Sequence, residues 1–292
     1  MSQKKQYNPV WLKSEKFWYT FWQKAEPPWR PSRGEINLYE KIIKKVMRKN
    51  KNPKALVLGS TSEIRDLLAK YKNIETTVID LNLPVHRAVS RLMKRKNLRE
   101  RLVVADWLKM PLPSCYFDLV FGHGNFENIK IKKHDLFYQN ISQVLKKDGL
   151  TIIARSCLET AFRRPVNFEY VIRKYKKDPQ FFKNFQNRVW ILYRLVSQPG
   201  VYDHQAQGVK FHVLMRKLLK EAKKQGLSNK EMRNLQWMPE LDPYTYYVEV
   251  DIKSLKKLKS MIQKYFIIET VYQDSYHPAA KFNYDFVLRS KN

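Results

Sequence analysis

The chain has 292 residues and a formal net charge of +29 at pH 7, with 43% hydrophobic and 13% aromatic residues. This hydrophobic content excludes a disordered chain and provides for a substantial core. Cys115 and Cys157 are the only cysteines, which excludes a disulfide framework and a cysteine metal site. No apolar run approaches the ~20 residues of a membrane span, and no signal-peptide core precedes the first domain. We therefore expect a cytoplasmic protein without a membrane partner or a metal.

The net charge has two interpretations. Basic surface gains affinity for nucleic acid through counterion release, so a nucleic-acid partner is one of them. The other is a lysine-rich, solvated surface. Lysines occur from end to end of the chain, as at Lys44-Lys45 and Lys256-Lys257, and this dispersion slightly favours the second interpretation.

Residues 1–31 are aromatic, basic and rich in proline. Trp11, Trp18 and Trp22 recur at spacings of seven and four, which predicts one apolar helical face. Ser32 and Glu35 then have the spacing of a capping box and predict a helix from about 36 to 48. The chain therefore begins with an aromatic cap segment that leads into a helix.

The next stretch predicts a strand, a tight turn and a helix. Ala55–Leu58 is a short continuous apolar run, as expected of a strand that is buried on both faces of a parallel sheet. Gly59 allows a sharp turn. Ser60 and Glu63 have the S-x-x-E spacing of a second capping box, so the following helix leaves its first backbone N–H groups free to face a ligand.

A β-branched strand at 76–79 ends on Asp80. In nucleotide-binding α/β sheets an acid at this place accepts the two ribose hydroxyls. The alternative is that Asp80 caps the next helix, a role that Asn82 can also fill. The segment itself favours neither reading.

Strands alternate with helices in the rest of the chain, except in a central region that is mainly helical. Strands are expected at 102–105, 117–121, 150–154, 266–271 and 282–288, with a turn at 146–149 and helices at about 85–96, 134–145 and 251–265, the last capped by Asp251. This alternation predicts a parallel sheet, in which the last two strands pair antiparallel because no helix separates them. Residues 159–243 read as a helical insertion, with helices in 166–198 and 209–224 and a capping box at Ser228 and Glu231.

Six segments, in their order and spacing, resemble the class I S-adenosylmethionine-dependent methyltransferases. They are VLGSTSE at 57–63, VID at 78–80, VVADWLKMPLP at 103–113, FDLVFGHG at 117–124, LKKDG at 145–149 and YDFVLRS at 284–290. The resemblance implies an α/β, Rossmann-like sheet of seven strands, mostly parallel with the last strand antiparallel. Residues 32–158 and 244–292 would form the methyltransferase domain, 1–31 its N-terminal cap, and 159–243 a lid or substrate region.

The resemblance also implies positions for the cofactor. Gly59 and Ser60 would lie under its methionine end, Asp80 would take the ribose hydroxyls, Asp106 would meet the adenine amino group with Trp107 beside the ring, and Gly122 would complete the site. Such enzymes usually carry two or three glycines in the first loop, and this chain has Gly59 alone. Either hydroxyls and N–H groups of the loop bind the methionine carboxylate, or the narrower loop weakens cofactor binding.

Methyl transfer needs proximity, a dry cavity and sometimes a base. His123, after the fourth strand, is the candidate base; a histidine hydrogen-bonded within its loop is the equally favoured alternative. Arg30 and Arg155 are candidates to pair with carboxylates of cofactor or substrate, although structural ion pairs are the commoner role of such arginines.

Two groups of aromatic residues are expected to close over the strand ends, or else to form a separate core. The first group is Trp18, Trp22 and Trp29, and the second is Trp190, Tyr193, Tyr202 and Phe211.

We thus expect an S-adenosylmethionine-dependent methyltransferase whose acceptor is a small molecule, an RNA or a protein. The alternative is a non-catalytic RNA-binding protein on the same fold. Dehydrogenases share the fold class, but their G-x-G-x-x-G sequence is missing here.

Overall fold

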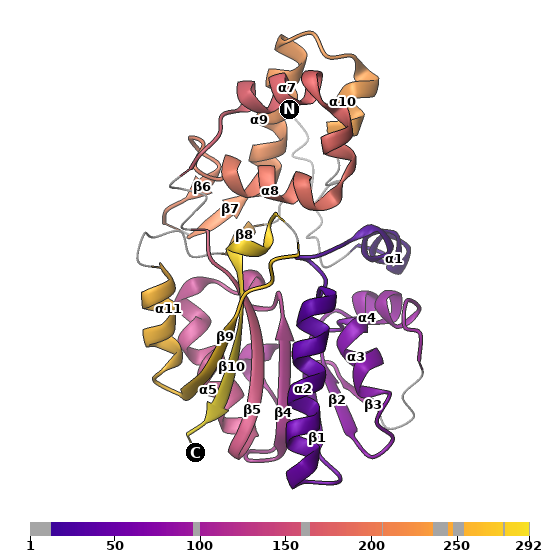
Figure 1. The fold of residues 1–292 in the computed structure, drawn as a ribbon, viewed down its shortest axis with the longest axis vertical. Helices are drawn as coiled ribbons and strands as arrows, with labels where there is room; N and C mark the ends of the chain where they lie inside the picture. Colours follow the sequence, from indigo (N-terminus) through magenta and orange to yellow (C-terminus); the bar gives the residue numbers. More distant parts are fainter. Residues whose placement is uncertain are drawn as a thin grey trace, which may run out of the picture.

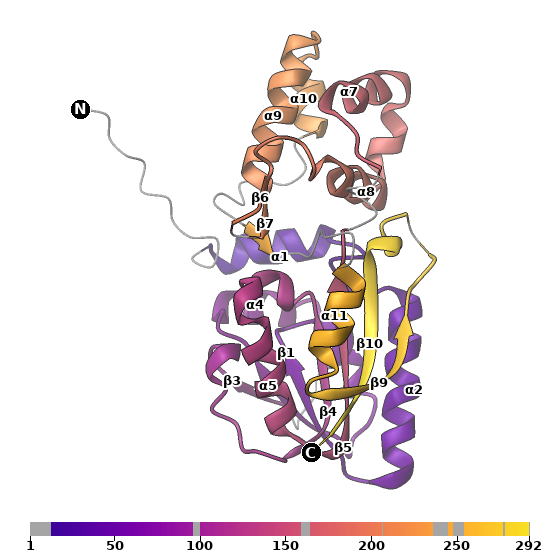
Figure 2. The same ribbon diagram turned by 90° about the vertical axis from the view of Figure 1, so that its left-hand side faces the viewer.

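The computed structural model describes residues 13–95, 100–158, 164–205, 207–235, 245–247, 254–276 and 278–291. Figures 1 and 2 show an α/β unit and, above the carboxyl ends of its strands, a mainly helical unit. Helix α1 (Glu15–Lys24) lies between the two units in both views. No helix among the described residues is long and apolar enough to cross a membrane.

The α/β unit is built on a seven-stranded sheet. Its strands are β1 (Lys54–Leu58), β2 (Glu75–Ile79), β3 (Glu100–Val103), β4 (Phe117–His123), β5 (Leu145–Ser156), β9 (Phe266–Tyr272) and β10 (Asn283–Ser290). Their order across the sheet is β3-β2-β1-β4-β5-β10-β9. Strand β10 runs antiparallel to both of its neighbours, β5 and β9, while the other pairs are parallel. The predicted fold class is confirmed.

Helices cover both faces of this sheet, which explains the apolar run of β1. Ala55 and Val57 pack with residues of α2 (Arg33–Lys49) and α3 (Ser62–Leu68) on one face. Leu56 and Leu58 pack with α5 (His134–Val144) and α11 (Ser254–Ile262) on the other. The side chains of Ala55 to Leu58 are fully buried, so polar residues do not alternate with apolar ones as they would in a half-exposed strand.

Of the two predicted capping boxes in this unit, one is present. The Ser32 hydroxyl accepts from the Glu35 N–H, and the Glu35 carboxylate accepts from the Ser32 N–H, so α2 begins as predicted. The box at Ser60 and Glu63 is wrong. Helix α3 begins one residue later, with Thr61 in the cap position, and has no side-chain cap.

The role of helix cap at the end of β2 belongs to Asn82. Its side chain accepts from the Val85 N–H at 3.0 Å and starts α4 (Leu83–Ser90). The alternative in which Asp80 caps this helix is therefore wrong.

The predicted turn at 146–149 lies within the bounds of β5, where Asp148 has a φ of 59° and the β4–β5 register shifts. It is therefore an irregularity of a longer strand.

The upper unit contains α7 (Phe168–Lys177), α8 (Phe185–Leu195), α9 (Phe211–Lys224) and α10 (Asn229–Leu235). The predicted helical stretch 166–198 is broken because Pro179 cannot continue α7, and a 3-10 turn follows it. Ser228 and Glu231 form the predicted capping box of α10.

A small antiparallel sheet was not predicted. Its strands are β6 (Tyr202–Asp203), β7 (Gly208–Lys210) and β8 (Thr245–Tyr247). Asp251 and Trp11 lie outside the described residues.

The aromatic residues of the N-terminal segment and of the insertion share one hydrophobic core. Trp18, Tyr193, Tyr202 and Phe211 are buried in it, and Trp22, Trp29 and Trp190 pack against it. The same core includes Ala88 of α4 and Phe282, which directly precedes β10. The two aromatic groups therefore contact each other and the α/β unit.

Candidate active site

The first half of the candidate site lies at the carboxyl ends of β1 and β2. Gly59 has a φ of 79°, a conformation that favours glycine, and its N–H donates to the Ile79 carbonyl at 2.8 Å. The Ser60 hydroxyl donates to Asp80 Oδ2 at 2.6 Å. Three of the predicted cofactor residues, Gly59, Ser60 and Asp80, are thus brought together by the turn after β1.

Asp80 is buried, and its carboxylate is held by neutral donors. Besides the Ser60 hydroxyl, the Asn82 N–H donates to Oδ1 at 2.8 Å. Burial raises the pKa of Asp80, and these two hydrogen bonds act in the opposite direction. A carboxylate has about four acceptor positions, so capacity remains for further hydroxyl donors.

Asp106 and Trp107 follow β3 and border the same half. Asp106 Oδ1 accepts from the Leu108 N–H at 2.9 Å and starts a 3-10 turn. The Trp107 indole N–H donates to the Ile79 carbonyl at 2.9 Å, and the ring stacks on Phe137 at a centroid distance of 6.0 Å. The ring reaches the first loop, since a Cβ placed on Gly59 would lie 3.4 Å from Trp107 Cζ2.

Asn125 was not recognised from the sequence. Its Nδ2 donates to the Leu58 carbonyl at 2.8 Å, at the end of β1. A Cβ on Gly122 would lie 2.8 Å from Asn125 Oδ1, so the glycine at this position makes room for the amide. Asn125 is 3% exposed, and its Oδ1 has no donor among the described residues. The signal in the sequence was the polar stretch His123-Gly124-Asn125 directly after a buried strand.

The second half of the site surrounds His123, the last residue of β4. Its Nε2 lies 3.1 Å from the Pro28 carbonyl oxygen, and its Nδ1 lies 3.4 Å from the Tyr39 hydroxyl. Glu35 Oε1 is 3.8 Å from Nδ1. The predicted base is therefore buried between the sheet, helix α2 and the N-terminal segment.

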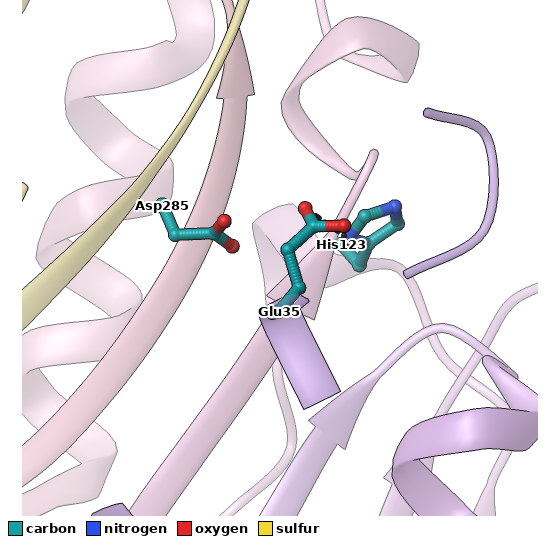
Figure 3. Close-up of side chains that lie close together, drawn as sticks. All are labelled: Glu35, His123 and Asp285. Carbon is teal, nitrogen blue, oxygen red and sulfur yellow. Dashed lines mark ion pairs between the residues drawn. The ribbon is translucent and has the colours of Figure 1, made fainter. Parts of the chain in front are cut away.

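Glu35 and Asp285 face His123 from two other elements. Figure 3 shows the Asp285 carboxylate, on β10, pointing toward Glu35 and His123. One ligand-type atom of each of the three residues lies within 4.8 Å of the others. The Tyr39 hydroxyl donates to Asp285 Oδ1 at 2.8 Å and so connects the carboxylate with the histidine. Sequence analysis missed Tyr39 and Asp285 and gave Glu35 only its role in the helix cap.

This buried group contains more acidic side chains than basic ones. Burial, followed by the charge of Glu35, raises the pKa of Asp285 well above its ordinary value. Burial and the charge of Asp285 likewise raise the pKa of Tyr39. Among the described residues, no lysine or arginine forms an ion pair with Glu35 or Asp285; the basic side chain nearest to Glu35 is His123, with 3.8 Å between Oε1 and Nδ1.

The two candidate arginines have structural partners. Arg30 pairs with Glu63 and donates to the Trp22 carbonyl at 3.0 Å, which joins the N-terminal segment to α3. Arg155 is fully buried, donates to the Tyr138 hydroxyl at 2.9 Å, and lies 3.9 Å from Glu127. These contacts agree with the alternative of structural ion pairs.

The residues at the strand ends fit S-adenosylmethionine. Asp80 retains acceptor capacity for ribose hydroxyls, and Asn125 Oδ1 is a buried acceptor to which a ligand N–H could donate. Gly59, with its positive φ, allows close approach of a ligand to the backbone. Trp107 borders this space, so its indole is the side chain that a ligand above Gly59 would meet.

Comparison with known proteins agrees with this geometry. A family model of the methyltransferase domain matches residues 57–149, which contain the end of β1, β2 to β4, α5 and the start of β5. No curated protein matches the sequence.

Solved structures share the fold at low identity. An N-methyltransferase, NodS from Bradyrhizobium japonicum WM9 in complex with S-adenosyl-L-homocysteine, has a TM-score of 0.51 and 9% identity, covering 96% of this chain and 100% of its own. The PH0226 protein of Pyrococcus horikoshii OT3 has a TM-score of 0.51 and 13% identity, with coverages of 93% and 99%. A protein from Rhodobacter sphaeroides described as a putative Zn-dependent alcohol dehydrogenase has a TM-score of 0.55 and 10% identity, with coverages of 96% and 100%.

At these identities the structural likeness shows the fold alone, and it is the family model that separates the methyltransferases from the dehydrogenases. The predicted resemblance is confirmed. Residues 57–149 thus match the methyltransferase domain, and the chain has the Rossmann-like fold that methyltransferases of solved structure share.

Proposed function

We propose that the protein transfers a methyl group from S-adenosylmethionine to an acceptor that loses a proton, with His123 as the base. The observation that carries this proposal is the position of His123. It is a buried titratable side chain at the end of β4, and its Nε2 points away from the sheet, toward the segment that covers the strand ends.

The cofactor contacts assigned from the resemblance are part of the proposal. Asp80 would accept the ribose hydroxyls, Gly59 and Ser60 would lie at the methionine end, and Asp106 with Trp107 would border the adenine. Gly122 would serve the site by leaving room for the Asn125 amide. When bound, the cofactor supplies a methyl group on a sulfonium; the residues around it fix its orientation and exclude water.

The described parts of the N-terminal segment and of the insertion are proposed to cover the acceptor. Their shared core extends from α1 to α9, and Trp29 meets Phe185 edge-on at a centroid distance of 5.0 Å. Arg30, joined to Glu63, ties this cover to helix α3. A dry, shaped cavity between the cover and the strand ends is what methyl transfer needs. In this division, residues 32–158 and 244–292 bind the cofactor and 159–243 shape the acceptor pocket.

Hydrogen exchange with and without S-adenosylmethionine tests both the cofactor contacts and the cover over the acceptor. Binding should slow exchange in the loops after Gly59, Asp80 and Trp107, and also in residues 18–31 and at least one helix of the insertion. Protection restricted to the three loops would contradict the cover, because the acceptor would then meet an open cleft. Failure of well-folded protein to bind at millimolar cofactor in calorimetry would contradict the methyltransferase function itself.

A nucleic-acid acceptor, or a non-catalytic RNA-binding role, rests on the net charge of +29. Several of the described lysines are engaged with acids at the surface, as are Lys45 with Glu269 and Lys146 with Asp118. Such pairs suit a solvated surface better than a phosphate-binding stripe. A nucleic-acid partner would show itself by an affinity that falls steeply with salt concentration.

A further inference from the structure

His86, on helix α4, lies beside the cofactor half of the site. The helix begins at Leu83, close after Asp80. The Nδ1 atom of His86 lies 3.1 Å from the Ser60 hydroxyl oxygen, and that hydroxyl donates to Asp80 Oδ2 at 2.6 Å. The ring is therefore at most two hydrogen-bond lengths from the carboxylate that is proposed to accept the ribose hydroxyls.

The Ser60 hydroxyl connects these two neighbours. A serine hydroxyl has one hydrogen, and here it is directed to Asp80, because an ionised carboxylate can only accept. Ser60 and Asp80 are 6% and 7% exposed, so water competes little for their hydrogen bond. The hydroxyl therefore fixes the distance between the carboxylate and the His86 ring.

The backbone of His86 is held in place as well. Its carbonyl accepts from the Ser90 hydroxyl at 2.7 Å, and the Ser90 oxygen accepts from Arg65 Nη2 at 2.9 Å. Arg65 is 2% exposed and pairs with Glu100 of β3, with 2.9 Å between Nε and Oε2. This chain of contacts ties α4 to α3 and to the edge strand β3, and so keeps His86 beside Ser60.

The imidazole of His86 is neutral at pH 7. Burial, followed by the charge of Arg65, lowers the pKa of His86 to about 4, while the charge of Glu100 acts in the opposite direction. A neutral imidazole has one nitrogen that donates and one that accepts. Within the described part of the chain, the ring meets a hydrogen-bond partner only through Nδ1, so Nε2 remains for a ligand.

A hydroxyl is the ligand group that suits this nitrogen. It both donates and accepts, so it can bond Nε2 whichever ring nitrogen carries the hydrogen. Ribose carries neighbouring hydroxyls, and Asp80 retains acceptor capacity for them. A ribose that reaches the Asp80 carboxylate therefore brings a hydroxyl close to the His86 ring.

We propose that His86 is a cofactor-binding residue, which recognises a ribose hydroxyl of S-adenosylmethionine beside Asp80. This rests on the proposed function, in which the protein binds this cofactor. A site that bonds a ligand hydroxyl disfavours the analogue that lacks it. His86 thus selects an adenosyl group whose ribose is intact over a deoxyribose analogue.

The experiment is calorimetry of the full-length protein with S-adenosylhomocysteine, the demethylated form of the cofactor, and with its 2′-deoxy and 3′-deoxy analogues. His86→Asn and His86→Gln are compared with the wild type. The asparagine amide lies near the place of Nδ1, so it keeps the contact with Ser60 and loses the outer nitrogen. The glutamine amide reaches the place of Nε2, so it keeps the contact with the ligand.

His86→Asn should weaken binding of S-adenosylhomocysteine about 3- to 10-fold, as expected for the loss of one hydrogen bond, and His86→Gln should weaken it less. For the analogue that lacks the contacted hydroxyl, His86→Asn should change the Kd by less than about twofold. The matched control is Arg87→Gln, at an exposed position of the same helix, which should leave every Kd unchanged. The melting temperature checks that each variant is folded.

An unchanged Kd in His86→Asn would overturn the inference, because the ring would then serve only to hold Ser60. Equal weakening of all three ligands by His86→Asn would also overturn it, because the effect would not depend on a ribose hydroxyl. In both cases the wild type still binds S-adenosylhomocysteine, so the proposed function stands. A well-folded wild type that binds none of the ligands at millimolar concentration would refute the proposed function and this inference together.

Discussion

The two halves of the strand-end edge satisfy their buried polar groups in different ways. At β1 and β2, the Asp80 carboxylate is held by a hydroxyl and a backbone N–H. At β4, β5 and β10, acids and bases are buried against one another: Glu35 and Asp285 with His123, and Glu127 with Arg155. The first half can offer acceptors to a ligand without any change of charge. The second half can gain or lose a proton, which suits the chemical step.

Two buried histidines, His123 and His134, lie in the second half of the site and have different surroundings. His123 has Glu35 and Asp285 as neighbours. His134, at the start of α5, is fully buried, and its Nε2 lies close to the Phe126 and Ile129 carbonyls at 3.0 and 2.8 Å. Burial, and then the charge of Arg155, lower the pKa of His134 to about 3. The two buried histidines therefore differ in their neighbours: carboxyl groups face His123, whereas backbone carbonyls and Arg155 face His134.

The largest effect is expected where a buried charge loses its counter-charge. Glu127 is 1% exposed, and its Oε1 lies 3.9 Å from the Nε of the fully buried Arg155. Glu127→Ala should lower the free energy of unfolding by about 3–5 kcal/mol in a denaturant titration, because it removes a buried carboxylate that lies beside the buried Arg155 cation. Glu169→Ala, which breaks an exposed pair with Arg173, should cost less than about 1 kcal/mol. Similar losses for the two variants would show that the buried pair has no special role.

In the first half, the effect should appear in binding. Asp80→Ala should weaken binding of S-adenosylmethionine by about 1.5–3 kcal/mol, roughly 10- to 150-fold in Kd, as expected for hydrogen bonds to a charged group. Calorimetry measures it. The control is Asn82→Ala, which removes the cap of α4 and should cost about 1 kcal/mol of stability with an unchanged Kd. An unchanged Kd for Asp80→Ala would place the ribose elsewhere.

A further effect is the dependence of stability on pH, to which the buried His134 contributes. The pKa of His134 is about 3 in the folded protein and 6.5 in its ordinary state, so the unfolded chain binds more protons as the pH falls below about 6.5. Stability should therefore decrease from pH 6.5 toward pH 3, by about 2 kcal/mol at pH 5 from this residue. His134→Gln should flatten the acid side of a curve of unfolding free energy against pH. A curve that keeps its acid slope in this variant would contradict the assignment.

Asp285 should act with the opposite sign. Its pKa is raised in the folded protein, so the native state holds a proton that the unfolded chain releases above pH 3.8. Stability from this group is complete at low pH and is lost as the pH rises toward the folded pKa. Asp285→Asn should remove this loss, and the difference between the two curves of unfolding free energy measures it.

Local signals in the sequence predicted the sheet well. The apolar run of β1, the β-branched β2 and the turn at Gly59 each require only short-range information, and the seven-stranded sheet with its antiparallel last strand was expected from the family resemblance. His123 was expected just after the fourth strand, at the edge where ligands bind, and it is the last residue of the longer β4. The second capping box was wrong because Ser60 has a stronger, non-local partner in Asp80.

The rest depends on contacts between residues far apart in the chain. Glu35 and Asp285 meet His123 only after α2 has packed against β4 and β10 has paired with β5, and neither position carries a local signal of a site. The Asn125 amide is fixed by a carbonyl 67 residues earlier. The small sheet of β6, β7 and β8 was missed because its strands are two or three residues long and show no periodicity.

The shared core of α1 and the insertion has a consequence for synthesis on the ribosome. Trp18 emerges early, but its packing partners Tyr193 and Phe211 follow more than a hundred residues later, and Phe282 is later still. At ordinary rates of elongation this interval is on the order of ten seconds. During that time the aromatic side chains of α1 can pack against α4 but lack the part of their core that the insertion supplies. Aromatic side chains of α1 thus stay exposed while the first five strands are synthesised and fold. We expect chaperones that bind exposed aromatic residues to bind this segment of the nascent chain.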